Sequence, residues 1–262
     1  MNYEWLDKLQ QVLDGGQIAN PRGNHTLELL HETITINTQQ PVLTVPERKL
    51  SYQFMAAEAY WILSGDGSVQ GIAPYNKHIA QFSDDGERFF GAYGPKVVAQ
   101  LPYVIEKLCE DPMSRQAGLT LWRECPPVTK DVPCTIAIFF NLRNGKLNCS
   151  VFMRSSDAWL GLPYDLFNFS MLTHLVCAKW NSRNKPMFAT PGTLSLTAAS
   201  MHLYEPHFGA ARECLENWIG EGPNATPLDF YYEDNGELMK VLSQLRGTKK
   251  GDPLRWWEHG KN

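Results

Sequence analysis

The chain has 262 residues, of which 43% are hydrophobic and 20% are charged, and its formal net charge at pH 7 is −4. This is ordinary globular composition, and a chain of this length can bury a substantial core as one large domain or two small ones. A protein that binds along the phosphate backbone of a nucleic acid is usually basic, and this chain is not. A few clustered arginines could still hold one phosphate. We therefore expect a small anionic ligand and no nucleic-acid partner.

The N-terminal residues 1–7 lack the basic and apolar regions of a secretory signal, and no apolar run approaches the ~18 residues of a membrane-spanning helix. These features predict a cytoplasmic protein with no membrane partner. The six cysteines are scattered and lack the close spacing of a zinc site, which predicts reduced thiols and no metal. They are Cys109, Cys125, Cys134, Cys149, Cys177 and Cys214.

Helical and extended patterns alternate along the chain. Apolar residues recur at helical spacing over 3–13, and residues 32–38 alternate like a half-buried strand. Two largely apolar helices are expected over 51–63 and 96–108. Strands follow over 117–123, 135–142 and 146–152, and Asn144-Gly145 between the last two is a strong type I′ hairpin signal. Pro163 introduces a helix over 166–180, followed by a strand over 193–198 and helices over 208–218 and 236–245.

These elements predict one α+β domain over residues 1–262, in which a central mixed sheet is covered by helices on one face. The chain contains no internal repeat and no low-complexity tract that would suggest a boundary.

The most informative segment is Arg154 to Asp165, which reads R-S-S-D-A-W-L-G-L-P-Y-D, and Pro133-Cys134 opens an apolar strand upstream of it. Together they resemble the thymidylate synthase family, whose R-S-x-D-x-x-L-G-x-P signature precedes a base-reading residue and follows a P-C dipeptide that carries the nucleophile. The resemblance covers about residues 18–208. It implies that the second sheet face packs on a second copy of the chain in a homodimer.

A lone cysteine at the start of an apolar strand most often packs in the core as a small hydrophobic residue. A catalytic role for Cys134 is implied only by the resemblance. The family's thiolate adds to C6 of a pyrimidine ring, and it needs a lowered pKa, which a nearby guanidinium such as Arg154 can provide. The family usually continues P-C-H, whereas this chain has Thr135. That departure affects the role of the histidine and leaves the nucleophile in place.

Single arginines are usually solvated surface charges, but four residues here match the family's phosphate ligands. They are Arg22, Arg115, Arg154 and Ser155. Arg115 stands where the family has an Arg-Arg pair that reaches the partner's phosphate site, and the second member here is Gln116. His202 and Tyr204 match an H-x-Y pair that contacts the sugar 3′-hydroxyl, and strand alternation would point both side chains the same way.

Asp165 could simply cap the helix that follows it. The resemblance instead gives it the base-reading position, where uracil-reading members have Asn and the deoxycytidylate hydroxymethylase branch has Asp. A carboxyl group can accept from N4 of cytosine and either donate a proton to N3 or pair with a protonated N3. Because thiolate addition pushes negative charge onto the ring, the second arrangement also stabilises the adduct. We therefore expect a cytosine nucleotide as substrate.

Three further residues match functional positions of the family. Glu58 lies among Ala, Tyr and Trp, which weakens the alternative of a solvated helix face, and it resembles the glutamate that relays protons near C4 and C5. Tyr93 would be a loop aromatic on its own and matches the active-site tyrosine of G-x-x-Y-G. Asp157 matches the carboxylate that holds the pterin of folate.

The resemblance implies 5,10-methylenetetrahydrofolate as co-substrate. A synthase adds hydride to the methylene formed on C5, whereas a hydroxymethylase lets water attack it, so exclusion of water decides the product. The family's methylating members close the site with a tryptophan near residues 79–83 and with an apolar C-terminal segment. This sequence differs from the family at both places. We expect deoxycytidylate 5-hydroxymethylation with release of tetrahydrofolate, and Trp256-Trp257 could provide another lid.

Two alternatives remain open. One is a dCMP methyltransferase or a thymidylate synthase that converts dUMP to dTMP, and the other is a non-catalytic relative that binds nucleotides or RNA. Ser155 with the His202 and Tyr204 pair favours deoxyribose over ribose. Bacteriophages make hydroxymethylcytosine nucleotides with enzymes of this family, so the resemblance implies a phage enzyme of DNA modification acting in an infected bacterial host.

Overall fold

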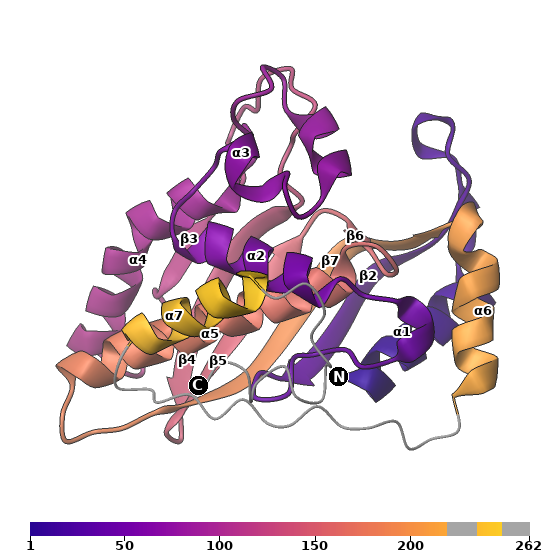
Figure 1. Cartoon of the computed structure of the whole chain (residues 1–262). Coiled ribbons are helices and arrows are strands. Elements are labelled where there is room, and N and C mark those ends of the chain that lie inside the picture. Colours follow the sequence, from indigo (N-terminus) through magenta and orange to yellow (C-terminus); the bar gives the residue numbers. More distant parts are fainter. Residues whose placement is uncertain (219–234, 248–262) are drawn as a thin grey trace.

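The structure is a computed structural model that describes residues 1–218 and 235–247. Its centre is a mixed sheet with the strand order β1-β2-β7-β5-β4-β3, and β6 pairs with β7 beside it (Figure 1). The strands are β1 Gln17–Ala19, β2 Thr26–Asn37, β3 Gly118–Thr120, β4 Thr135–Arg143, β5 Lys146–Met153, β6 Ser156–Asp157 and β7 Thr190–Tyr204. The α-helices are α1 Asn2–Gly15, α2 Tyr52–Leu63, α3 Val69–Ile72, α4 Tyr93–Glu110, α5 Leu162–Arg183, α6 Phe208–Asn217 and α7 Asn235–Gly247.

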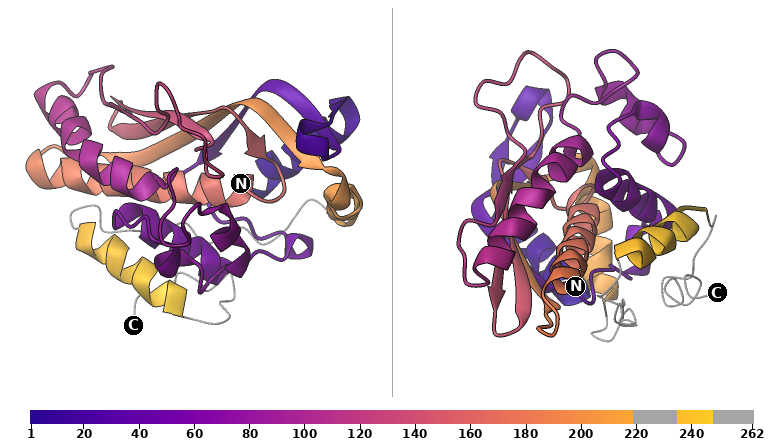
Figure 2. Two further views of the ribbon diagram at one scale, coloured as in Figure 1. Left: turned by 90° about the horizontal axis from the view of Figure 1, so that it is seen from above. Right: turned by 90° about the vertical axis from the view of Figure 1, so that its left-hand side faces the viewer.

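The sheet has one buried and one open face. Along β4 and β5 the buried side chains alternate with less buried ones, as a strand with one covered face requires. Figure 2 places the helices on the covered face, with α5 directly against the strands and with α2 and α7 beyond it. The predicted α+β class, with helices on one sheet face, is confirmed.

The open face carries apolar side chains. Phe139 and Phe152 pack edge to face, with their ring centroids 6.4 Å apart, and 42% of the Phe152 side chain is exposed. Phe152 pairs in register with Thr197, which in turn lies opposite Thr33 on β2. An apolar patch thus borders a row of small polar residues.

The hairpin between β4 and β5 is the one that its turn sequence predicts. Asn144 and Gly145 have φ angles of 51° and 70°, and a type I′ turn requires positive φ at both positions. The hairpin brings the end of β5 back to the start of β4, where the backbone N–H of Arg154 donates to the Cys134 carbonyl over 2.8 Å. The expected proximity of Arg154 and Cys134 is confirmed.

Several strands and one helix begin or end at residues other than those expected from the sequence. β2 and β7 are much longer than residues 32–38 and 193–198, because they pair with each other from Thr26↔Tyr204 to Asn37↔Thr193. Their polar positions interrupt the pattern without ending the strands, since the open face tolerates Ser and Thr. β3 is shorter than residues 117–123. The helix expected from residue 166 begins at Leu162, because Pro163 fits the first turn of a helix.

Within residues 1–218 and 235–247, none of the helices combines the length and the apolar character that crossing a bilayer requires. The six cysteines are all free thiols, as expected.

Candidate active site

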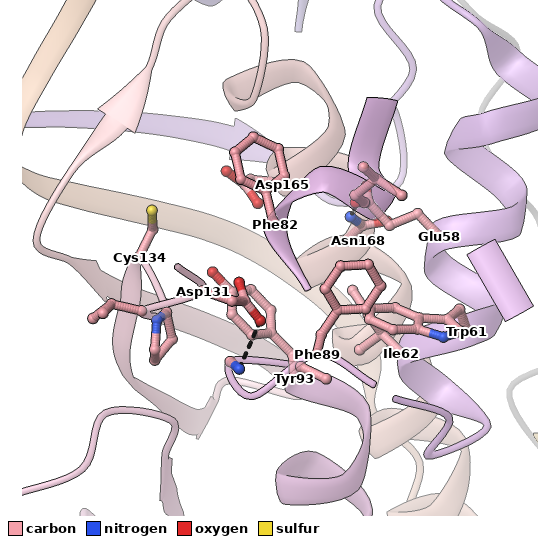
Figure 3. A pocket seen from close by; sticks show the side chains of 15 residues that line it. Glu58, Trp61, Ile62, Phe82, Phe89, Tyr93, Asp131, Cys134, Asp165 and Asn168 are labelled. Carbon is pink, nitrogen blue, oxygen red and sulfur yellow. Dashed lines mark hydrogen bonds between the residues drawn. The ribbon is translucent and has the colours of Figure 1, made fainter. Parts of the chain in front are cut away.

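A pocket of about 180 Å³ opens between the start of β4, the first turn of α5, and α2. Its polar lining consists of three carboxyl groups, a thiol, a phenol and an amide (Figure 3). These groups belong to Glu58, Asp131, Asp165, Cys134, Tyr93 and Asn168. All four residues predicted to be catalytic, Cys134, Glu58, Tyr93 and Asp165, therefore lie in one pocket.

Cys134 lies just before β4, where the backbone of the preceding loop is tied to Arg154. The Arg154 guanidinium donates from Nε to the Pro133 carbonyl over 3.1 Å and from Nη2 to the Val132 carbonyl over 3.0 Å. These bonds fix the guanidinium beside the thiol, where its charge favours the thiolate. The loop and the arginine thus position the sulfur at the pocket wall.

The pKa of Cys134 differs from the sequence expectation. Burial of the thiol raises its pKa above the ordinary value, and the positive charge of Arg154 opposes that shift without overcoming it. Ionisation of Asp165 would raise the pKa of Cys134 further. The expectation of a lowered pKa is therefore wrong, because the loss of hydration of the thiolate outweighs its attraction to Arg154.

Tyr93 stands at the start of α4 and is held by the residue that replaces the family's histidine. Thr135 donates from its backbone N over 3.2 Å and from Oγ1 over 3.0 Å, both to the Tyr93 hydroxyl oxygen. Because both lone pairs of that oxygen are engaged, its own proton is available to an acceptor in the pocket. Burial raises the pKa of Tyr93, so the hydroxyl remains a donor.

Asp165 lies in the first turn of α5, on a segment anchored from several sides. The Trp5 indole donates to the Ala158 carbonyl over 2.8 Å, and Arg48 Nε donates to the Trp159 carbonyl over 2.8 Å. The side chain of Asp165 makes no capping hydrogen bond, and its backbone N–H already donates within the helix to Gly161. The capping explanation is therefore wrong, and within the described residues the carboxyl group has no hydrogen-bond partner.

The environment of Asp165 favours its neutral form. Burial raises its pKa well above the ordinary value, and the nearby negative charges of Glu58 and Asp157 act in the same direction. Figure 3 shows Asp165 across the pocket from Asp131, with Cys134 to one side. A carboxyl group that can donate a proton therefore faces the space beside the thiol.

Glu58 projects from α2 into the same pocket, where Asn168 of α5 donates from Nδ2 to Glu58 Oε2 over 2.8 Å. Burial raises the pKa of Glu58 to about 7, although the hydrogen bond from Asn168 lowers it. The expected raised pKa is confirmed. A carboxyl group that titrates near neutral pH can both give and take a proton under physiological conditions.

A second pocket gathers the residues expected to hold the phosphate and the sugar. A hollow of about 220 Å³, where the start of β2 meets the end of β7, is lined by Arg22, Arg154, Ser155, His202 and Tyr204. His202 and Tyr204 lie on the same side of β7, with ring centroids 5.1 Å apart, as strand alternation predicts. Two guanidinium groups with a serine hydroxyl suit a phosphate.

Other predicted residues are not brought to either pocket within the described part of the chain. Arg115 is exposed on the loop between α4 and β3, so a role at a phosphate site would need a second copy of the chain. Asp157 accepts from the backbone N–H groups of Trp159 and Leu160, both over 2.8 Å. Its role toward folate stays a prediction. Trp256 and Trp257 lie outside the described residues.

Several polar residues of these pockets were missing from the sequence prediction, among them three with a carboxyl or amide group. Asp131 and Asn168 line the first pocket, and Glu28, which accepts a hydrogen bond from the Ser200 hydroxyl, lines the second. Asn168 lies three residues after Asp165, which places it on the same helix face, so its position could have been inferred. Asp131 sits in an irregular loop, where no periodicity places a side chain.

The remaining wall of the first pocket is apolar. Trp61, Ile62, Ile79, Phe82 and Phe89 form it, and 48% of the Phe82 side chain is exposed. Ile79 and Phe82 of the segment 79–83 therefore line the pocket, although no tryptophan stands there. Such a wall suits the aromatic rings of a pyrimidine or a pterin.

Comparison with known proteins agrees with this geometry. A family model described as thymidylate synthase matches residues 3–228. A deoxyuridylate hydroxymethyltransferase of Bacillus phage SP01 is 31% identical over an alignment of 271 residues, which covers 92% of this chain and 68% of that protein. The chain therefore belongs to the thymidylate synthase family.

Proposed function

We propose that the protein transfers a hydroxymethyl group from 5,10-methylenetetrahydrofolate to C5 of dCMP and releases tetrahydrofolate. Membership of the thymidylate synthase family supports one-carbon transfer to a nucleotide with folate as co-substrate. The observation that carries the choice of base is the carboxyl group of Asp165, which faces the same pocket as the Cys134 thiol and has a strongly raised pKa.

The base is selected by the basicity of its edge. A neutral carboxyl group has one donor and one acceptor, so it can hydrogen-bond to the N3–N4 edge of cytosine or to the N3–O4 edge of uracil. N3 of cytosine is a much stronger base than O4 of uracil, and only N3 can draw the Asp165 proton toward itself. The resulting charge-assisted pair is stronger than a neutral one and favours cytosine.

The same proton of Asp165 also promotes nucleophilic addition to the ring. When the carboxyl proton moves toward N3, the ring becomes a better electron acceptor, and the Cys134 sulfur forms a bond to C6 while the ring takes up the electron pair. Arg154 favours the thiolate required for this step. Glu58, with a pKa of about 7, can remove the C5 proton after the one-carbon unit is attached and can return it to solvent.

Attack by water rather than hydride is supported by two observations. The phage relative is named as a hydroxymethyltransferase. In addition, Phe82, which lines the pocket, is about half exposed, and this favours entry of water to the reacting carbon. The relative's name gives deoxyuridylate as its substrate, so dUMP is the second candidate for this chain.

The second pocket supports a nucleoside monophosphate as the substrate form. Arg22, Arg154 and Ser155 would hold the phosphate, and His202 and Tyr204 would hold a sugar hydroxyl. We also propose a homodimer built on the open sheet face, because an exposed apolar patch around Phe152 favours association. In this assembly Arg115 would complete the phosphate site of the other subunit.

The substitution Asp165→Asn tests the choice of base. The ratio of kcat/KM for dCMP to that for dUMP should fall by at least tenfold, since the amide can neither give nor share the proton with N3. An unchanged ratio would mean that Asp165 does not read the base. Glu28→Gln is a matched control, because it removes a carboxylate from the second pocket and should leave this ratio unchanged.

A further inference from the structure

The first pocket contains one carboxyl group that the proposed reaction has not used. Asp131 lies on the loop before β4, three residues from Cys134, and it lines the pocket with Cys134 and Asp165. Figure 3 shows it between Cys134 and the apolar side chains of Phe89 and Trp61, opposite Asp165. A carboxyl group beside an apolar wall is costly to bury, so its presence calls for a chemical reason.

The Asp131 side chain is held in one orientation. Its Oδ2 accepts from the backbone N–H of Gly91 over 2.7 Å. A Cβ atom at position 91 would come within 2.5 Å of the Asp131 backbone oxygen and 3.0 Å of Oδ2, so only glycine permits this approach. Asp131 lines the pocket, and its other carboxyl oxygen, Oδ1, makes no hydrogen bond within the described part of the chain.

The loop that carries Asp131 is itself fixed. Asp84 accepts hydrogen bonds from the Thr129 hydroxyl and from the backbone N–H of Lys130, the latter over 3.0 Å. These contacts tie the loop to the segment that follows Phe82. Burial raises the pKa of Asp131, which brings the carboxylate closer to the strength of a useful base.

We propose that Asp131 is the general base that holds and deprotonates the water molecule that attacks the methylene group on C5. The inference rests on the proposed hydroxymethyl transfer. Asp131 Oδ1 takes one proton from water, and the oxygen forms a bond to the methylene carbon. The electrons of the methylene double bond enter the ring, and expulsion of the Cys134 sulfur from C6 restores the C5–C6 double bond. The proton leaves Asp131 for solvent.

In this scheme Asp131 acts only when water attacks the methylene group, after the addition to the ring and the removal of the C5 proton. The addition of Cys134 to C6 and the action of Asp165 at N3 come before the folate leaves, and Glu58 removes the C5 proton. A residue needed only for the attack of water should therefore leave tritium release from C5 intact while it controls the fate of the methylene intermediate.

The experiment uses the full chain with dCMP tritiated at C5 and methylenetetrahydrofolate, and it compares wild type with Asp131→Asn. Asparagine keeps an oxygen acceptor for Gly91 N–H and removes the base. We expect tritium release within a few fold of wild type and a drop of at least about 10²-fold in hydroxymethyl product. Added 2-mercaptoethanol should then trap the methylene intermediate as a thioether that mass spectrometry detects.

Thr129→Val is the matched control. It removes the hydroxyl that donates to Asp84 and accepts from the Asp131 backbone N–H over 3.1 Å, so it loosens the loop, but it keeps the Asp131 carboxyl group. It should keep the wild-type ratio of hydroxymethyl product to tritium release. Hydroxymethyl product from Asp131→Asn at the wild-type ratio, or an equal loss of tritium release and product, would overturn the role of Asp131. A wild-type enzyme that makes only a methylated nucleotide would overturn the proposed function itself, which is a different result.

Discussion

Asn168 of α5 and Glu58 of α2 are joined by a hydrogen bond of 2.8 Å from the amide Nδ2 to the carboxylate Oε2. Asn168 is 3% exposed, and its Oδ1 has no partner among the described residues. The amide therefore has an unused acceptor next to a carboxyl group whose pKa is about 7. Rotation of the amide would let it accept from protonated Glu58 as well as donate to ionised Glu58.

Replacing Asn168 by Ala should raise the pKa of Glu58, because the hydrogen bond from Asn168 lowers it. The pH profile of kcat/KM should then show its Glu58-dependent limb at higher pH. Ser170→Ala is the control, since Ser170 is equally buried in α5 and donates only to the Leu166 carbonyl. A limb that stays in place in Asn168→Ala would mean that Glu58 does not control it.

Cys134→Ser should keep nucleotide binding and lose at least about 10³-fold in turnover, because the hydroxyl cannot form the C6 adduct at a comparable rate. Binding is measured by calorimetry with dCMP, and turnover by tritium release from C5. The exposed Cys125→Ser variant controls for general thiol loss. Substantial turnover by Cys134→Ser would refute nucleophilic catalysis.

Glu58→Gln should change how stability depends on pH. The native state keeps the Glu58 proton up to about pH 7, whereas the unfolded chain loses it near 4.5. Between these values the native state binds more protons, so the free energy of unfolding of wild type falls as pH rises. Above pH 7, Glu58→Gln should be more stable than wild type by roughly 1–3 kcal/mol. Denaturant unfolding at pH 5 and pH 8 measures this difference, and an equal difference at both values would contradict the buried carboxyl.

The homodimer is tested by complementation. Arg115→Ala and Cys134→Ser should each be inactive, but refolding them together should restore activity, because the intact Cys134 site receives Arg115 from the other subunit. Phe152→Asp should abolish the dimer in sedimentation experiments, since it places charge in the exposed apolar patch. If the mixture stays inactive while dimers form, Arg115 does not act across the interface.

The hairpin and the helices could be predicted because their signals are local. Asn144-Gly145 fixes the turn, and the apolar periodicity of α1 and α4 indicates those helices. The full extent of β7 could not be predicted, since its polar residues are tolerated only through long-range pairing with β2. The single domain over 1–262 stays a prediction, because residues 219–234 and 248–262 lie outside the described structure.

The site residues that belong to recognisable sequence motifs could be predicted. The signature at 154–165 located Asp165, and the hairpin placed Arg154 beside Cys134. The shift in the pKa of Cys134 was not predictable, because it depends on the balance of burial against Arg154 in the folded pocket. Asp131 was missed for a similar reason, since only the folded loop brings it to the pocket.

The most direct test of the account is the mass of the nucleotide formed from dCMP and methylenetetrahydrofolate by the purified protein. Hydroxymethyl transfer predicts a gain of one CH₂O unit with release of tetrahydrofolate. A gain of one CH₂ unit with release of dihydrofolate, or turnover of dUMP in preference to dCMP, would contradict the proposed reaction or its base.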